Sequence, residues 1–593
     1  MKNLLRSVVP CLQSAGIILC LSVSAMASGS VGRVWHVSQA VLPGVDEPDQ
    51  MRTISEAAQR VGPGDTVVIH SGTYREAVTV EQSGTADQPI RFVAAPGDRV
   101  VVTGADLITQ WEPVGSDPNK RIFKARWTHR FITWNDPNTH PNDDYHRVIG
   151  RAEQVFVNHY LLSQVLSRDE MSRGSFYVDT EAQELYIWDS SNGKITDEQT
   201  VEASAREVIW KSKGSYLEVH GIRFRYAANH AQQGAVAFDG DHNLVEDCVF
   251  EKTNGAGADF GGKGITVRRC TFQDNGQLGF GASGAHDLHM SDCTIRSNNT
   301  KNFDRGWEAG GNKLSMSRGV VLENSRFVEN RGHGIWFDIG NEDCTVRNCL
   351  IADNEDAGIF YEISYGLHAY DNVIVGNGFD STPESWGANG GISISSSPGC
   401  LIERNLLIGN KEGFQFREQG RTTPRIGHRR GEAEVPIWNH DEVIRNNVLA
   451  FNRDAQVWGW FDTDDDRHLP AAKQRKRPGE EQWAGPADLS LEKLNLKFEN
   501  NLYYAAPGQG LINWGCSWSK HANYTSLAEM RSDLGLDEGG RVADPGFRDF
   551  TARDLRVPGG SPAVTMGCYP KGQTPGVTLG ETSEEGDIAP EGK

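Results

Sequence analysis

A repeat of 22 to 24 residues limits the fold of this chain more than any other feature. From Tyr216 onward a pentapeptide recurs with a small or amide residue at its centre, as in the segments around Cys248 and Asn447. Such a period predicts a β-solenoid, in which each coil buries its inward face against its neighbours and aligned amides bond along the axis. The predicted ladder consists of Cys248, Cys270, Cys293, Ser325, Cys349, Asn372, Asn405, Asn447 and Asn501.

Two successive coils repeat nearly the same strand, with an acid at the same place. Gly334-Ile-Trp-Phe-Asp-Ile returns 24 residues later as Gly358-Ile-Phe-Tyr-Glu-Ile. The alternation within each copy is typical of a strand with two different faces. If the coils stack, Asp338 lies beside Glu362, about 4.8 Å away. Because stacked like charges destabilise a sheet, we interpret the two as a catalytic pair.

Alignment of the first strand of each coil on its preceding glycine predicts the two faces of these strands. The predicted inward residues are Phe280, Trp307, Ile335, Phe337, Ile359, Tyr361, Ile392, Ile394, Phe414 and Phe416. The predicted outward residues are Gly281, Ser283, Glu308, Gly310, Trp336, Asp338, Phe360, Glu362, Ser393, Ser395, Gln415, Arg417, Trp458 and Trp460. The outward set predicts a surface strip of carboxylates, hydroxyls, an arginine and exposed rings that binds substrate beside the acid pair.

Three residues of this region have two interpretations. Glu308 either supports the acid pair or is simply solvated. His333, just ahead of its strand, either lines the substrate groove or is a turn residue without a role. Arg417 either pairs with the catalytic acids or a substrate, or forms a structural ion pair with Glu412 or Glu418.

Insertions lie beside the same strip. The ladder spacing lengthens to 32 residues before Ser325 and to 54 before Asn501, and the added residues are 297–305, 379–389, 419–440 and 462–494. Long loops beside a rigid scaffold often build sites, so we expect them to wall the strip into a groove. Residues 417–430 carry five arginines and His428, which either bind acidic sugars or offset the acidic chain.

The remaining segments give the domain organisation. Residues 1–27 read as a secretory signal peptide, which predicts export to the periplasm or the medium. Residues 28–104 contain a short helix pattern at 54–61 and the first coils, and 105–205 read as an inserted β-subdomain. We expect the solenoid over 206–573 and a disordered acidic tail over 574–593. No later run is long enough to span a bilayer, and the net charge of −20 argues against nucleic-acid binding.

The cysteines are assigned mostly by the repeat. Two of the ten, Cys11 and Cys20, lie in the signal segment, and the four ladder cysteines are predicted to be buried. Cys344, Cys400, Cys516 and Cys568 remain, and a disulfide between the last two stays open in an exported protein. No Cys-x-x-Cys pair is present, so we predict neither a metal site nor any other cofactor.

Two motifs resemble known proteins. Residues 62–80, GPGDTVVIHSGTYREAVTV, resemble the N-terminal cap of right-handed parallel β-helix proteins of the pectate-lyase-like kind. The two acidic strands resemble those of secreted β-helix glycosidases, notably the β-xylosidase family, over residues 216–417. The resemblance implies an all-β, right-handed parallel β-helix, with Asp338 as nucleophile and Glu362 as acid/base.

The sequence therefore predicts an exported, retaining glycoside hydrolase acting on a poly- or oligosaccharide. An inverting pair of Glu308 and Asp338, which this register places on the order of 8 Å apart, is one alternative. A polysaccharide lyase is a second, with calcium held by the carboxylates; it ranks lower because the predicted strip lacks an outward lysine. A non-catalytic carbohydrate-binding solenoid is the third.

Overall fold

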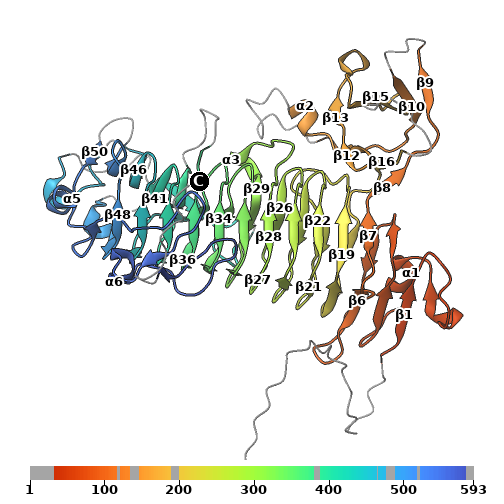
Figure 1. The fold of residues 1–593 in the computed structure, drawn as a ribbon, viewed down its shortest axis with the longest axis horizontal. Coiled ribbons are helices and arrows are strands. Elements are labelled where there is room, and N and C mark those ends of the chain that lie inside the picture. Colours follow the sequence, from red (N-terminus) through yellow and green to blue (C-terminus); the bar gives the residue numbers. More distant parts are fainter. Residues whose placement is uncertain are drawn as a thin grey trace, which may run out of the picture.

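The computed structural model describes residues 32–115, 121–133, 146–188, 199–379, 388–429, 431–463, 465–475, 486, 488–516 and 521–582. Three long sheets run along one axis, and each coil contributes one parallel strand to each sheet (Figure 1). The predicted parallel β-helix is confirmed. The predicted signal peptide lies outside the described residues. No helix among the described residues is long and apolar enough to cross a membrane.

The sheet that carries the acid pair is called the site sheet. Its strands, in order, are β5 (Val78–Val80), β17 (Trp210–Ser212), β20 (Gly234–Phe238), β23 (Ala256–Phe260), β26 (Leu278–Ser283), β29 (Gly310–Ser315), β32 (Ile335–Phe337), β35 (Ile359–Glu362), β38 (Gly390–Ser395), β41 (Glu412–Glu418), β46 (Ala455–Phe461), β49 (Gly510–Gly515) and the antiparallel β50 (His521–Tyr524).

The other two sheets complete each coil. One contains β2 (Gln50–Met51), β1 (Val34–Val37), β3 (Thr66–Ile69), β6 (Ile90–Ala94), β18 (Leu217–His220), β21 (Leu244–Glu246), β24 (Thr266–Arg268), β27 (His289–Ser291), β30 (Val321–Glu323), β33 (Glu342–Arg347), β36 (Tyr365–Tyr370), β39 (Leu401–Glu403), β44 (Val443–Arg445) and β47 (Lys497–Glu499). The other contains β4 (Gly72–Tyr74), β7 (Val100–Thr103), β19 (Ile222–Arg225), β22 (Val249–Glu251), β25 (Thr271–Gln273), β28 (Thr294–Arg296), β31 (Arg326–Val328), β34 (Leu350–Ala352), β37 (Val373–Val375), β40 (Leu406–Ile408), β45 (Val448–Ala450), β48 (Leu502–Tyr504) and β51 (Arg541–Val542).

One continuous apolar core fills the solenoid. All predicted inward residues except Trp307 are buried in it. Phenylalanines stack from coil to coil, with ring centroids of Phe224 and Phe250 5.3 Å apart and those of Phe250 and Phe272 4.6 Å apart. Trp307 instead lies outside the solenoid on α3 (Arg305–Glu308), packed against buried Phe303.

Two amide ladders run along the axis. The predicted one is present, with Asn372, Asn405 and Asn447 each donating to the next amide at 2.9 to 3.1 Å. A second ladder was not predicted. It links Asn275, Asn298, Asn330, Asn354, Asn377, Asn410 and Asn452 at 2.9 to 3.2 Å. Both ladders satisfy buried polar groups and keep the coils in register.

Helices cover the two ends of the core. The helix pattern predicted near the N-terminus is present as α1 (Ile54–Ala58), which begins at a capping box formed by Thr53 and Glu56. At the other end, α5 (Leu527–Leu534) buries its apolar residues in the core. Covering the ends removes open strand edges from solvent.

The chain leaves the solenoid after β7 and returns at β17. Between them lie a four-stranded sheet and a five-stranded sheet around a separate small core (Figure 1). Their elements are β8 (Ala105–Leu107), β9 (Glu112–Val114), β10 (Ile122–Arg126), α2 (His146–Ile149), β11 (Val155–Val157), β12 (Tyr160–Leu161), β13 (Ser163–Val165), β14 (Ser175–Asp179), β15 (Glu184–Trp188) and β16 (Val201–Ser204). This part of the chain is called the subdomain.

The C-terminal segment folds back along the outside of the solenoid. Its residues Leu555 and Leu579 cover outward apolar side chains of the sheet that contains β34 and β37. The segment includes α6 (Pro562–Thr565) and the paired strands β52 (Val557–Pro558) and β53 (Glu581–Thr582). The tail predicted to be disordered from 574 is therefore ordered as far as 582, because it covers this strip; 583–593 lie outside the described residues.

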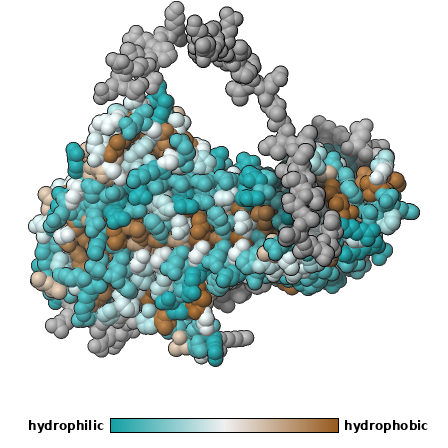
Figure 2. All heavy atoms as spheres, turned by 90° about the horizontal axis from the view of Figure 1, so that it is seen from below, coloured by the Kyte–Doolittle hydropathy of each residue, from teal (hydrophilic) through white to brown (hydrophobic). Residues whose placement is uncertain are grey.

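The described cysteines are buried, and the outer surface seen in Figure 2 is mostly hydrophilic. In the described chain all eight cysteines are buried and no disulfide joins Cys516 to Cys568. Figure 2 views the molecule from below, where hydrophilic residues dominate and apolar residues form narrow bands. On the sheet containing β21, a glutamate on every third coil meets a histidine from the preceding coil and an arginine from the following coil. These glutamates are Glu246, Glu323 and Glu403.

Candidate active site

The register of the site sheet brings Asp338 and Glu362 to neighbouring coils. Trp336 pairs with Phe360, and Asp338 and Glu362 each lie two residues farther on along the same strands. The residues that follow the two acids, Ile339 and Ile363, have φ of 60° and 38°. A β-branched residue rarely adopts this left-handed region, so the backbone is strained directly after both acids.

Asp338 is held by a lysine. Its carboxylate is buried, and Oδ2 lies 3.0 Å from Nζ of Lys313. The same ammonium lies 3.1 Å from Oε1 of Glu308 and 4.3 Å from the ring centroid of Trp336. Burial alone would lower the pKa of Lys313, but the Asp338 and Glu308 carboxylates together raise it. Lys313 is thus a fixed cation within ion-pair distance of both carboxylates.

Glu362 lies in a different electrostatic environment. It is 3% exposed, and its Oε1 accepts a hydrogen bond from Nη1 of Arg421 at 2.8 Å. Burial raises the pKa of Glu362, and the nearby Asp338 charge raises it further; Arg421 opposes both effects without cancelling them. Glu362 therefore keeps its proton to higher pH than an ordinary glutamate does.

The aromatic rings near the pair are buried, which contradicts the prediction of exposed rings. Trp336 and Phe360 stack at 5.6 Å in a small cluster that includes Ala388, from the end of the 379–389 insertion. His333 packs against both rings, with centroids 4.9 Å from each. Burial, reinforced by nearby cations, lowers the pKa of His333 to about 3, so this imidazole is neutral. The cluster supports the strands that carry the acids.

The predicted register was wrong at one coil. Strand β29 presents Lys313 and Ser315 outward, paired with Gly281 and Ser283, instead of Glu308 and Gly310. The sequence alignment used Gly306, five residues before Gly311, because the insertion before this strand extends farther than expected. Glu308 ends α3 and still reaches the site, through Lys313. The expectation that no lysine lies near the acids is also wrong.

The rest of the predicted strip has the expected register but is largely covered. Ser395 pairs with Arg417, which pairs with Trp460, and Gln415 pairs with Trp458. Ser395, Gln415 and Arg417 are buried, whereas the two tryptophans are half-buried. The Arg417 guanidinium lies 4.8 Å from the Trp460 ring centroid. Burial lowers the pKa of Arg417 to about 10, against the attraction of Glu362 and Glu412.

A hairpin from the third insertion contacts Glu362 of the acid pair. It consists of β42 (Arg421–Thr423) and β43 (Val435–Ile437). Arg421 contacts Glu362, and Arg425 Nε donates to Oε1 of Glu342 at 2.8 Å. Two arginines of the arginine-rich loop therefore pair with carboxylates of the solenoid itself.

Metal binding has little support in the described part of the chain. There, no group of three or more histidine, cysteine, aspartate or glutamate side chains is arranged to hold an ion. The three carboxylates that the lyase alternative assigned to calcium each contact a cationic side chain: Glu308 and Asp338 contact Lys313, and Glu362 contacts Arg421.

Comparison with known proteins places the fold. A family model described as a right-handed β-helix region matches residues 207–306 and 234–407. The solved complex of XylC with xylose aligns over 86% of both chains, with a TM-score of 0.63 and 16% identity. Pectate lyase Pel9A aligns over 94% of this chain and 91% of its own, with a TM-score of 0.36 and 14% identity. An uncharacterized Bacillus subtilis protein, YwoF, is 40% identical over 56 residues, which span 12% of its length. The chain is a right-handed parallel β-helix protein.

Proposed function

We propose that this protein is an exported glycoside hydrolase in which Asp338 is the nucleophile and Glu362 the acid/base. The observation that carries the proposal is the unequal environment of two neighbouring carboxyls. Lys313 faces Asp338 at 3.0 Å, whereas burial and the Asp338 charge raise the pKa of Glu362. One anionic and one protonated carboxyl on adjacent coils are what a retaining glycosidase needs.

The reaction follows in two steps. Glu362 gives its proton to the glycosidic oxygen while an Asp338 oxygen attacks the anomeric carbon, so the leaving sugar departs as an alcohol and a glycosyl ester forms. Glu362, now anionic, takes a proton from water, which attacks the anomeric carbon and releases Asp338. Adjacent coils lie about 4.8 Å apart, near the roughly 5–5.5 Å that a retaining pair requires.

The inverting alternative with Glu308 and Asp338 is less well supported. An inverting pair needs room for a water molecule between its carboxyls. Lys313 lies between these two, at 3.1 and 3.0 Å, so the contacting oxygens are no more than about 6 Å apart. The space for the water is taken by an ammonium group.

The lyase alternative gains a candidate base in Lys313, which the register predicted from the sequence did not place on the outward face. A lysine that abstracts a proton must lose its own first, and this requires a lowered pKa. The pKa of Lys313 is raised instead, by the two carboxylates beside it. The electrostatics therefore favour the hydrolase. An ultraviolet-absorbing unsaturated product from alginate or pectate would reverse this order.

The substrate class is proposed from the fold neighbour that was solved with xylose. A panel of aryl glycosides, beginning with aryl β-D-xylosides, tests the activity. We expect turnover by the wild type, none by Asp338→Asn, and initial release of the retained anomer by proton NMR. Initial release of the inverted anomer would reject the Asp338 and Glu362 roles. Binding without turnover on every glycan would favour the carbohydrate-binding alternative.

A further inference from the structure

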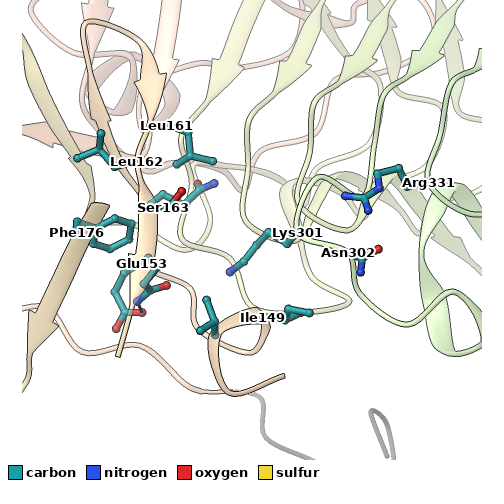
Figure 3. Close-up of a pocket in the computed structure, with 12 residues that line it drawn as sticks. Ile149, Glu153, Leu161, Leu162, Ser163, Phe176, Lys301, Asn302 and Arg331 are labelled. Atoms are coloured by element: carbon teal, nitrogen blue, oxygen red, sulfur yellow. Dashed lines mark hydrogen bonds between the residues drawn. The ribbon is translucent and has the colours of Figure 1, made fainter. Parts of the chain in front are cut away.

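A cavity of about 480 Å³ lies between the subdomain and the solenoid. Its size falls within the roughly 300–1,000 Å³ range of small-molecule sites. Neither acid of the proposed catalytic pair lines it. Figure 3 shows side chains from both bodies facing the cavity. The lining residues include Glu153, Leu161, Gln164, Lys301 and Arg331.

Lys301 is the central polar group of the cavity. It extends from the solenoid toward the subdomain (Figure 3). Its Nζ donates to the backbone oxygen of Arg151 in the subdomain and, at 2.6 Å, to Oδ1 of Asn254 in the solenoid. Both acceptors are neutral, and within the described ranges no carboxylate lies within 4.0 Å of this nitrogen. Burial lowers the pKa of Lys301 to about 7, against the attraction of Glu153. A ligand carboxylate in the cavity would supply a negative charge in direct contact with this nitrogen, which Glu153 does not.

Other groups around the cavity restrict what the ligand can be. Gln164 donates from Nε2 to Glu153 at 3.1 Å, while its Oε1 is buried and accepts no hydrogen bond within the described chain. A ligand hydroxyl is the complementary donor. Leu161 is 47% exposed and provides an apolar surface. The charged groups around Lys301 are Arg151, Glu153 and Arg331, so cations outnumber acids there and the surroundings favour an anionic ligand.

We propose that this cavity is a second saccharide site, which binds a uronic acid residue with its carboxylate on Lys301. One ligand hydroxyl donates to Gln164, and the apolar ring face lies on Leu161. The site is separate from the catalytic pair, so binding here stands or falls independently of the proposed hydrolysis. It would hold an acidic unit of a polysaccharide beside the enzyme while a neutral bond is cleaved elsewhere.

The test compares two ligands that differ only in the carboxylate. Methyl β-D-glucuronide and methyl β-D-glucoside are titrated calorimetrically into the full-length Asp338→Asn variant. We expect the glucuronide to bind about tenfold or more tightly, the scale of a hydrogen bond to a charged group. At pH 8 the amine of Lys301 is mostly neutral, so glucuronide binding should take up a proton, visible as a buffer-dependent heat. At pH 5.5 the uptake should vanish.

Variants assign the binding to the cavity. Lys301→Met should lose the preference for the glucuronide and the proton uptake. Lys252→Met is the matched control, because Lys252 also reaches the subdomain, donating to the His159 backbone oxygen at 3.5 Å, but does not line the cavity. Leu161→Trp, at a half-exposed position, should block binding without removing a charge. Equal binding of both glycosides, no binding of either, or equal effects of the two lysine variants would overturn the proposal.

Discussion

Replacing Lys313 by methionine gives the most direct test of the electrostatics proposed for the acid pair. The change removes an ammonium that contacts Asp338 at 3.0 Å and Glu308 at 3.1 Å. The side chains of Lys313 and Asp338 are only 11% and 10% exposed, so water screens their interaction weakly. Removing one partner of a buried ion pair typically costs about 3–5 kcal/mol. Glu308 is 24% exposed and contributes less, so we expect the Asp338 contact to dominate the loss.

A double-mutant cycle separates this effect from general damage. Asp338→Asn removes the charge that Lys313 balances, so Lys313→Met combined with Asp338→Asn should be more stable than Lys313→Met alone by about 1–3 kcal/mol. The double variant should nevertheless remain inactive, because it lacks the nucleophile. The second substitution should thus raise stability without restoring activity.

The assay is urea unfolding at pH 7.5, with hydrogen exchange of β29 and β32 to report local opening, because a solenoid need not unfold in one step. Lys263→Met is the matched control: this exposed lysine pairs with exposed Asp287 at 3.7 Å and should matter little. The reasoning fails if Lys313→Met is no less stable than Lys263→Met. It also fails if the double variant is no more stable than Lys313→Met.

Three further predictions follow from the same structure. Glu362→Gln should slow cleavage of a substrate with a poor leaving group by about 10²–10⁴-fold and slow cleavage of an activated aryl glycoside far less. Azide should partly restore the rate on the activated substrate. Equal losses of rate on both substrates would contradict the acid role. Burial raises the pKa of Glu412 from 4.5 to about 8, so the folded state holds this proton and wild-type stability falls as pH rises through that window. In urea unfolding, Glu412→Gln should have the same free energy of unfolding as the wild type at pH 5 and a higher one at pH 8.5, by up to about 4 kcal/mol. A difference that does not depend on pH would reject the raised pKa of Glu412. Asn372→Ala, which orphans the Val346 carbonyl and the Cys349 amide, should cost about 2–4 kcal/mol and increase hydrogen exchange in the neighbouring coils; an unchanged urea midpoint would contradict the ladder.

The repeat made most of the fold predictable, because a solenoid converts spacing along the chain into stacking in space. Regular coils, such as those of Asp338 and Glu362, followed the expected register. The second amide ladder could also have been found, since each of its asparagines lies five residues after a member of the predicted ladder, as Asn377 does after Asn372. The same rule would have placed Asn410 and Asn452.

Register failed where an insertion supplied a second glycine. Gly306 and Gly311 both precede a residue pattern that fits a strand, and only the second lies in β29, which begins at Gly310. Alignment on Gly306 displaced the predicted strand by five residues, so Lys313 was missing from the predicted outward residues. Burial of Trp336 was unpredictable for another reason: residues of a distant insertion, such as Ala388, cover it, and no local pattern records that contact.

The electrostatics of the proposed site depend on those same insertions. Asp338 and Glu362 come from the repeat, and two bare carboxylates on adjacent coils would only repel each other. Glu308 and Lys313 flank the end of the first insertion, and Arg421 comes from the third, 59 residues beyond the acid it contacts. Both acids are buried and each contacts a cation, but the charge of Asp338 adds to burial in raising the pKa of Glu362. The repeat therefore supplies the spacing of the pair, and residues in and beside the insertions supply the charged partners on which the proposed retaining mechanism relies.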